Sequence, residues 1–279
     1  CGSRQQAASG SWVVLEASGF DGRDVEDADL DRAVKVLRKR MDKVGLAEAR
    51  LERDGERIKV ELPEKLRKDV LPVLIRPGRL ELYDLQGDLL DSSKDAQGFP
   101  LARTSKLELP PGAVLVTCGR AERYCPGIQE VPAKTYFYVF KYQPTDAEHP
   151  IPEMTGKDFE AGSIRQDFDT HTNEPIVFFD FTPEGGQKFL EVTRTLAERG
   201  QRLWTRYGGV RENWLQQFAI VLDREIKSAP TIDFRDNPAG IPPDNGAQIT
   251  GIGSLVEARE LALVLKTGAL PVELRPVSG

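Results

Sequence analysis

Residues 12–85 alternate between apolar patterns typical of strands and of helices, and this alternation strongly limits the possible folds. Between residues 29 and 44, apolar side chains recur every three or four positions, which predicts an amphipathic helix that Gly45 ends. Asp54 and Gly55 form a hairpin signal between two short apolar runs. The predicted elements are a strand at 12–17, a helix at 29–44, strands at 50–53 and 58–62, a helix at 63–75 and a strand at 79–85.

This β-α-β-β-α-β order is that of the ferredoxin-like fold, which we predict for a base formed by residues 12–86. After this segment the periodicity is interrupted by Gly, Ser, Asp and Pro, and further strands and helices follow. A helix that starts at Pro183 is predicted to end at Gly200. We predict an α+β fold class, with a larger α+β head subdomain at 87–266 inserted before a C-terminal strand segment, 267–279, that joins the base. Residues 1–11 are small and polar and are predicted to form a flexible tether.

Composition and motif content exclude several classes of function. The net charge is −6 and no segment has the basic excess of a nucleic-acid-binding surface. No uncharged apolar run approaches the roughly 18 residues that a membrane-spanning helix requires. The two histidines, His149 and His171, lie in loop-like sequence without the spacing of metal ligands, and no nucleophile elbow or phosphate-binding loop occurs. We therefore predict a non-enzymatic protein with no metal site, no cofactor and no nucleic-acid partner.

Cys118 and Cys125 lie seven residues apart in the sequence VTCGRAERYCPG, whose glycines and proline favour a chain reversal. In an oxidising compartment the two thiols are expected to form a disulfide, which would stabilise the fold by about 2.5 kcal/mol in the chain-entropy model. The alternative is a pair of reduced thiols in a cytosolic protein.

Cys1 precedes a flexible segment rich in Gly, Ser, Gln and Ala. A chain that starts in this way resembles a mature bacterial lipoprotein, in which the first cysteine is lipidated. Two or more acyl chains would anchor it stably, whereas one would not. We therefore expect an extracytoplasmic protein, held at the outer face of the cell membrane through lipidated Cys1. The alternative is that the given sequence begins at a cysteine by chance.

A strand predicted at residues 136–142 is unusually aromatic. Its alternation places four aromatic rings on one face, those of Tyr136, Tyr138, Phe140 and Tyr142. An aromatic strand with an open edge would suit the addition of an extended polypeptide, so these four residues are the candidate binding site. Replacing Tyr138 or Tyr142 by Ala is then expected to weaken peptide binding more than the same change at Tyr207. The alternative is that both faces of the strand are buried in the core.

Several segments, taken in their order and spacing, resemble the first extracytoplasmic domain of SecD, an accessory subunit of the bacterial Sec protein translocase. The resemblance covers roughly residues 12–275. The segments that carry it are LDRAVKVLRKRMDKVGL, GERIKVELP, MTGKDFEAG, PIVFFDFTPEGGQKFLEVT, FAIVLDREIKSAPTI, VEARELA and ALPVELRP. The resemblance implies a base, an inserted head, and contact between the head and translocated polypeptide.

The family's membrane helices and its Leu-Asp-Leu-x-Gly-Gly motif are missing from this sequence, so we expect no proton relay within it. It would be a piece of a longer protein or a lipid-anchored relative. The expected partners are unfolded or emerging polypeptides, components of the Sec translocon, and the membrane through the lipid anchor. Because the head is acidic, we expect extended apolar-basic peptides to bind. The alternative function is a lipid-anchored binding module for an unrelated ligand.

Overall fold

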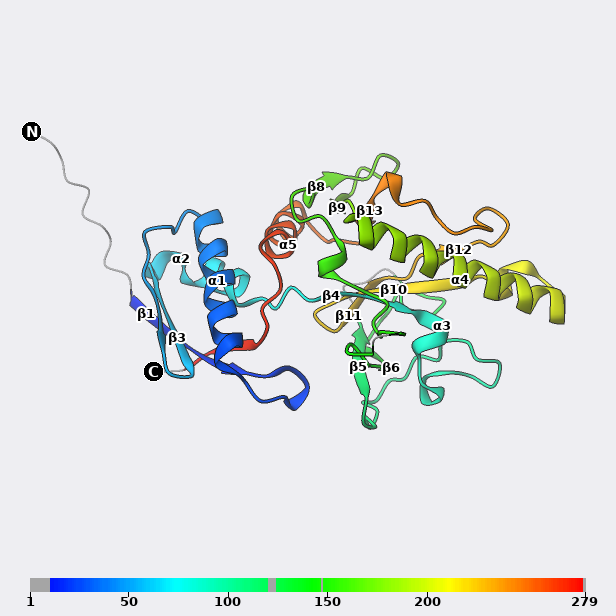
Figure 1. Cartoon of the computed structure of the whole chain (residues 1–279), viewed down its shortest axis with the longest axis horizontal. Helices are drawn as coiled ribbons and strands as arrows, with labels where there is room; N and C mark the ends of the chain where they lie inside the picture. Colours follow the sequence, from blue (N-terminus) through cyan, green and yellow to red (C-terminus); the bar gives the residue numbers. More distant parts are fainter. Residues whose placement is uncertain (1–10, 120–123, 147, 278–279) are drawn as a thin grey trace, which may run out of the picture. The chain divides into compact units, whose positions relative to one another are not determined.

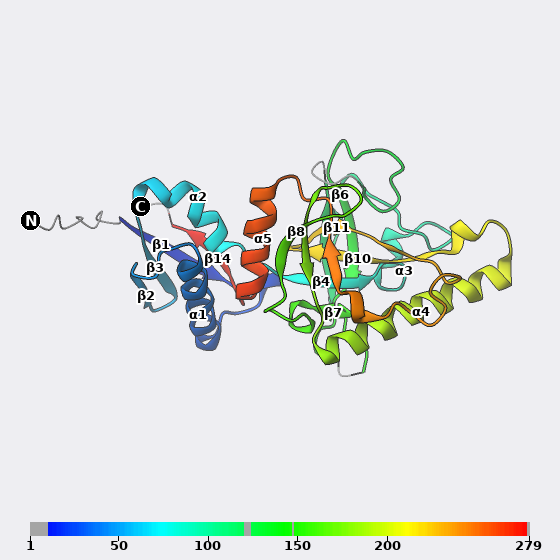
Figure 2. The ribbon, with the colours of Figure 1, turned by 90° about the horizontal axis from the view of Figure 1, so that it is seen from above.

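The chain divides into two compact units, which we describe separately. The computed structural model describes residues 11–119, 124–146 and 148–277. The first unit comprises residues 1–78 and 267–279, and the second comprises residues 79–266. The second unit therefore begins at Arg79, whereas the sequence analysis placed the start of the head at residue 87. Cys1 lies outside the described residues. Figures 1 and 2 show the ribbon in two orientations.

The first unit is built on one four-stranded sheet in the order β14-β1-β3-β2. All neighbouring strands in it are antiparallel. Its elements, in chain order, are β1 (Ser11–Ser18), the 3₁₀ turn η1 (Phe20–Gly22), α1 (Asp27–Lys43), β2 (Leu51–Asp54), β3 (Arg57–Leu62), α2 (Glu64–Ile75) and β14 (Glu273–Pro276). The β-α-β-β-α-β order of the sequence analysis is present, and its last strand comes from the far end of the chain.

The helix α1 begins and packs as its sequence predicts. Glu26 and Asp29 form a reciprocal capping box at its first turn, which satisfies backbone N–H groups that have no partner within the helix. Leu30, Leu37 and Met41 recur at helical spacing and are buried against the sheet side chains of the first core. The amphipathic stripe therefore fixes which face of α1 meets the sheet.

The assignment of residues 79–85 to the base is wrong. The strand β4 (Leu80–Asp84) lies in the seven-stranded sheet of the second unit, where it pairs with β10 and β7. All five of its residues are buried, so the strand needs cover on both faces. The base sheet does not offer this, since β1 alternates between buried and exposed positions.

The described residues of the second unit form two sheets. The larger has the order β6-β5-β11-β10-β4-β7, with β12 also paired to β10, and the smaller has the order β13-β9-β8. The strands are β4, β5 (Ala113–Cys118), β6 (Tyr136–Lys141), β7 (Met154–Thr155), β8 (Arg165–Phe168), β9 (Pro175–Phe179), β10 (Gln216–Leu222), β11 (Glu225–Ser228), β12 (Thr231–Ile232) and β13 (Ala247–Ile249). The helices are α3 (Leu85–Asp88), α4 (Pro183–Tyr207) and α5 (Leu255–Thr267). The described residues also form the 3₁₀ turns η2 (Asp91–Ser93), η3 (Gly156–Asp158), η4 (Arg211–Trp214) and η5 (Pro243–Asn245). The predicted α+β fold class is confirmed.

Each face of the larger sheet has its own core. On β10, Phe218 and Ile220 belong to a core shared with α4, α5 and the smaller sheet, whereas Ala219 and Val221 belong to a second core. That second core also contains Tyr138 and Phe140 of β6. The continuous apolar sequence of β10 follows from this two-sided burial.

Cys118 and Cys125 are joined by a disulfide in the structure. Their Sγ atoms are 2.01 Å apart and their Cα atoms 5.8 Å apart. Both cysteines are fully buried and belong to the core that contains Tyr138. The bond thus fixes the end of β5 to the segment that precedes Pro126.

Candidate functional site

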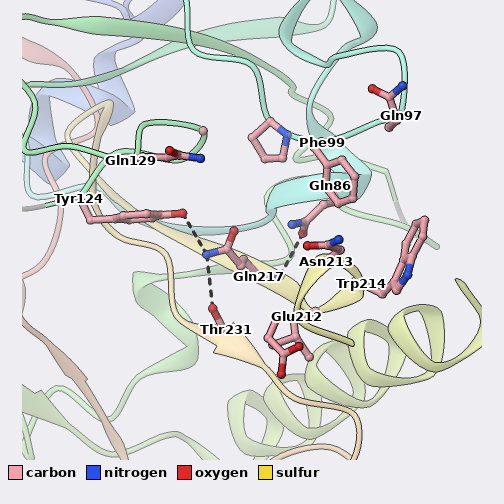
Figure 3. Close-up of a pocket in the computed structure, with 13 residues that line it drawn as sticks. Gln86, Gln97, Phe99, Tyr124, Gln129, Glu212, Asn213, Trp214, Gln217 and Thr231 are labelled. Carbon is pink, nitrogen blue, oxygen red and sulfur yellow. Dashed lines mark hydrogen bonds between the residues drawn. The ribbon is translucent and has the colours of Figure 1, made fainter. Parts of the chain in front are cut away.

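The second unit contains a cleft made of two adjoining cavities with volumes of about 680 and 550 Å³. Figure 3 shows the first cavity. Four residues line both cavities and so mark where they meet: Gln86, Gln97, Phe99 and Trp214. The first cavity is rich in carboxamide side chains, which it takes from Gln86, Gln97, Gln129, Asn213 and Gln217. Aromatic rings stand among them, those of Phe99, Tyr124 and Trp214.

One side of the cleft is a short closed loop at residues 94–100. The carboxylate of Asp95 accepts hydrogen bonds from the backbone N–H groups of Gln97 and Phe99, each at 2.9 Å. Lys94 and Pro100 close the loop as an isolated antiparallel bridge. An Asp side chain that satisfies its own loop's donors favours such a turn, and here it presents Gln97 and Phe99 to the cleft.

The opposite side is the end of α4 together with η4. The Trp214 indole Nε1 donates to the Gly208 carbonyl at 2.8 Å, and its ring stacks on Tyr207 with centroids 5.4 Å apart. The Phe99 ring approaches Trp214 from the facing loop at 6.0 Å. Three rings from three separate segments therefore form an aromatic cluster at the boundary between the cavities.

A glycine allows this side to form. A Cβ atom at Gly200 would lie 2.8 Å from the Trp214 carbonyl oxygen and 2.9 Å from the Phe234 ring. The sequence analysis predicts that Gly200 ends the helix, which is wrong, because α4 continues to Tyr207. Gly200 is instead a place where α4 and the Trp214 backbone of η4 lie too close together for a side chain.

The floor of the cleft is a network of polar side chains. Arg199 donates two hydrogen bonds to the carboxylate of Asp84, at 2.5 and 2.6 Å, and a third to Gln216 Oε1 at 2.6 Å. The side chain of Gln86 accepts from the backbone N–H of Gln217 at 2.9 Å. These bonds hold α3, α4 and β10 together, so the floor is preorganised for a ligand.

Asp88, at the end of α3, is a buried carboxyl group beside this floor. Its Oδ2 accepts from the backbone N–H of Asp84 at 2.9 Å, and its residue is 4% exposed. Burial raises the pKa of the Asp88 carboxyl to about 8, and the charges of Asp84 and Glu153 act in the same direction. At pH 7 the protonated form of the Asp88 carboxyl is therefore favoured over the charged form.

The Asp88→Asn variant is expected to be more stable than the wild type at pH 8.5 by at least about 1 kcal/mol. The folded-state pKa lies above the ordinary value of 3.8, so the stability from neutral Asp88 is present at low pH and is lost as pH rises from about 4 to about 8. Asn keeps an acceptor without a charge. Urea unfolding at pH 5, 7 and 8.5 should show an advantage that grows with pH. Asp236→Asn, a change at an exposed carboxylate, serves as control.

The four aromatic residues predicted to bind polypeptide do not form an open surface. Tyr138 and Phe140 are fully buried, and Tyr136 and Tyr142 pack against the same core. The Tyr138 hydroxyl donates to the Pro126 carbonyl at 2.6 Å. The Tyr142 hydroxyl accepts from Arg79 at 2.7 Å. The alternative stated in the sequence analysis, an aromatic strand buried in the core, is the one that these contacts support.

The outer edge of β6 is also covered. The backbone of Phe137 both donates to and accepts from Arg103, at 3.0 and 3.4 Å. At Val139, the carbonyl accepts from Leu90 N–H and the N–H donates to Ser93 Oγ, both at 2.9 Å. A polypeptide would have to displace these partners to add as a strand, so the hypothesis of strand addition at β6 is wrong for this conformation.

The sequence analysis missed the cleft and used one of its residues as a comparison. Tyr207, which served there as the control substitution, is the last residue of α4, is 59% exposed and lines the second cavity. The available signal was the spacing of aromatic and amide residues in segments 203–217 and 97–99, but nothing in the sequence indicates that these segments meet.

Two further observations concern the described residues as a whole. Within residues 11–119, 124–146 and 148–277, no helix is both long enough and apolar enough to cross a membrane. In the same residues, no three His, Cys, Asp or Glu side chains gather as they would around a metal ion.

The chain resembles one protein family along almost its whole length. A family model described as the P1 head subdomain of SecDF matches residues 148–272, which lie mostly in the second unit. The protein translocase subunit SecDF of Thermus thermophilus is 30% identical over 267 residues, which cover 94% of this chain and 29% of that protein. The protein translocase subunit SecD of Calditerrivibrio nitroreducens is 27% identical over 269 residues, which cover 94% of this chain and 42% of that protein.

Solved structures agree with these matches. A structure of SecDF, described as a membrane component that enhances protein export, has a TM-score of 0.59 and 27% identity, with 96% of this chain and 98% of that chain covered. A crystal structure of SecDF in a super-membrane-facing form has a TM-score of 0.59 and 25% identity, with 96% and 29% covered. The chain spans less than half the length of the curated relatives that it matches. Along 94–96% of its length the chain is therefore similar to a part of SecD and SecDF proteins, and this part includes the P1 head subdomain.

Proposed function

We propose that this domain assists protein export by binding extended polypeptide in the cleft of its second unit. The proposal is one of binding, without a chemical step. The relatives are subunits of the protein translocase, so polypeptides in transit are the ligands that the family relationship favours. The observation that carries the proposal is the lining of the first cavity, where carboxamide groups alternate with aromatic rings.

This lining matches the chemistry of an unfolded chain. A carboxamide offers both donors and acceptors, as a peptide backbone does, and it carries no charge that would favour one sequence. Aromatic rings give large apolar contact at low entropic cost. Tyr207 and Tyr124 are exposed by 59% and 42%, so a ligand can reach their rings. Because ordering a flexible peptide offsets much of the contact energy, we expect affinities in the micromolar range or weaker.

The location and partners follow from the same proposal. Contact with exported polypeptide requires the cleft to lie on the extracytoplasmic side of the membrane, and components of the Sec translocon would deliver the ligand. Lipidation of Cys1 stays a separate prediction, which mass spectrometry of the protein from its native membrane would test.

Trp214 provides a direct test, because it lies at the boundary of the two cavities and only Trp12 and Trp204 accompany it in the sequence. In the Trp12→Phe/Trp204→Phe double variant, Trp214 is the only indole. An extended peptide should shift its emission to shorter wavelength with a dissociation constant in the micromolar to millimolar range. The Trp204→Phe/Trp214→Phe variant, which reports from Trp12 in the first unit, should show no change.

A matched pair of aromatic variants tests the position of the binding surface. Tyr207→Ala should weaken peptide binding about three- to tenfold, as expected for the loss of one aromatic contact. Phe168→Ala removes a ring of 45% exposure on β8 that lines neither cavity, and it should leave binding unchanged. Equal effects of the two variants, or no response of Trp214 to any peptide at millimolar concentration, would contradict the proposal.

A further inference from the structure

We propose that the second cavity binds a carboxylate group of the polypeptide and that Lys94 is the residue that selects it. This inference rests on the proposed function, since it concerns which chains the cleft prefers. It is drawn from the charges of the residues that line the second cavity.

The second cavity is lined by cations without a lining carboxylate. Among its twelve lining residues, Lys94 and Arg199 carry positive charge and none is Asp or Glu. The first cavity differs, because Glu212 is its one charged lining residue. Glu212 is paired with Arg211 at 3.1 Å, so the excess charge of the cleft is positive and lies in the second cavity. An extended chain with an acidic group would therefore have a preferred position.

The charge of Arg199 is already matched. Its two terminal nitrogens bind the two carboxylate oxygens of Asp84 at 2.5 and 2.6 Å. Its Nε donates to Gln216. A pair with this bidentate geometry leaves little charge for a ligand, so Arg199 shapes the cavity and does not select the ligand.

The charge of Lys94 is matched only weakly. Its side chain is 18% exposed, and its ion-pair partner Asp91 lies at 3.8 Å with a fully exposed side chain. Burial lowers the pKa of the Lys94 ammonium, which shows that the charged form lacks solvation. A solvent-exposed carboxylate at this distance is worth little to a partly buried ammonium.

A second ammonium strengthens the positive potential. Lys141 donates to the carbonyl of Gly87, a lining residue, at 3.1 Å. The carboxyl of Asp88, on the same short helix, compensates for this charge only in part at neutral pH, because burial raises its pKa to about 8. A carboxylate that enters the cavity would thus meet the poorly solvated ammonium of Lys94 in a region of positive potential. A charge-assisted hydrogen bond formed there is strong.

This conclusion differs from the one that the net charge suggests. The head is acidic as a whole, which predicts a preference for basic peptides. The second cavity, however, is positive within that acidic unit. Charges beyond a Debye length of about 8 Å are largely screened at physiological salt, so the groups that line the cavity decide what it accepts.

Three peptides of one apolar sequence test the proposal with Trp214 as the reporter. The first contains a central Glu, the second a central Gln, both with blocked ends, and the third is the Gln peptide with a free C-terminal carboxylate. The protein with Lys94 in place should bind the Glu peptide about five- to tenfold more tightly than the blocked Gln peptide. In Lys94→Gln, the ratio of the affinities for the Glu and blocked Gln peptides should fall to about one. Lys157→Gln, the same change at an exposed lysine that lines neither cavity, should keep the preference.

The outcomes separate this inference from the proposed function. If all three peptides bound with equal affinity, the carboxylate site would be overturned, while the proposal of polypeptide binding would stand. Tighter binding of the free-ended peptide alone would support the site and identify a chain end as the source of the carboxylate. A preference that persists in Lys94→Gln would overturn the role of Lys94. Absence of binding by all three peptides would overturn both proposals.

Discussion

Replacing Arg40 by Met is expected to destabilise the first unit by about 3 kcal/mol or more. Arg40 lies on α1, is fully buried, and donates to the carbonyls of Leu74 at 2.7 Å and Gly268 at 2.9 Å. It also binds the Arg76 carbonyl and Thr267 Oγ1. Met fills a similar volume, but it leaves these buried acceptors without a donor, and each such loss costs roughly 1–3 kcal/mol.

The measurement uses Trp12 as the reporter of the first unit, in the Trp204→Phe/Trp214→Phe background. Urea unfolding should show a lower midpoint for Arg40→Met than for its parent. Lys39→Met, a change at an exposed neighbour on the same helix, should alter the free energy of unfolding by less than about 0.5 kcal/mol. If the two variants were equally stable, the carbonyl contacts of Arg40 would contribute nothing, and its burial would need another explanation.

Tyr138→Ala is expected to destabilise the second unit by about 3–5 kcal/mol, because it removes a fully buried ring from the core. Tyr138→Phe keeps the ring and removes only the hydrogen bond to the Pro126 carbonyl, so it should cost about 1–2 kcal/mol. Unfolding followed by Trp214 fluorescence would give both values. Peptide affinity of the folded Tyr138→Phe protein should equal that of the wild type.

The opposite pattern would support the original sequence hypothesis. If Tyr138→Ala kept its stability and lost peptide binding, the aromatic strand would be the binding surface after all. Tyr207→Ala distinguishes binding at the aromatic strand from binding in the cleft. The exposed ring of Tyr207 lies in the cleft and contributes little to stability. We expect the substitution to weaken binding with a change in stability of less than about 1 kcal/mol.

Local patterns predicted the elements of the first unit well. The apolar stripe of α1 and the turn signal at Gly55 depend on neighbours within a few residues, and both appear in the structure. The strand at 79–85 was found but placed in the wrong sheet, because strand pairing depends on distant partners. The strand is completely buried, but its sequence does not indicate this, because Glu81 and Asp84 are polar.

The candidate site was harder to predict for a physical reason. The alternation along residues 136–142 correctly puts four rings on one face, but it cannot show whether another segment covers that face. Here the core of the second unit covers it. The cleft, in contrast, gathers side chains from α3, the loop at 94–100, η4 and β10, which no local pattern connects. The buried Gly200 permits η4 to approach α4, but in the sequence a glycine at this position predicts the end of a helix.

The position of β14 in the first sheet determines when that sheet can be completed during synthesis of the chain. This strand pairs with β1, yet more than two hundred residues separate it from β3, the other neighbour of β1. At a synthesis rate of about 5–20 residues per second, roughly 10–40 s pass between the emergence of β3 and that of β14. Throughout that interval one edge of β1 lacks its backbone partner, a state that favours pairing with other chains. The first unit to be made is therefore the last to be completed.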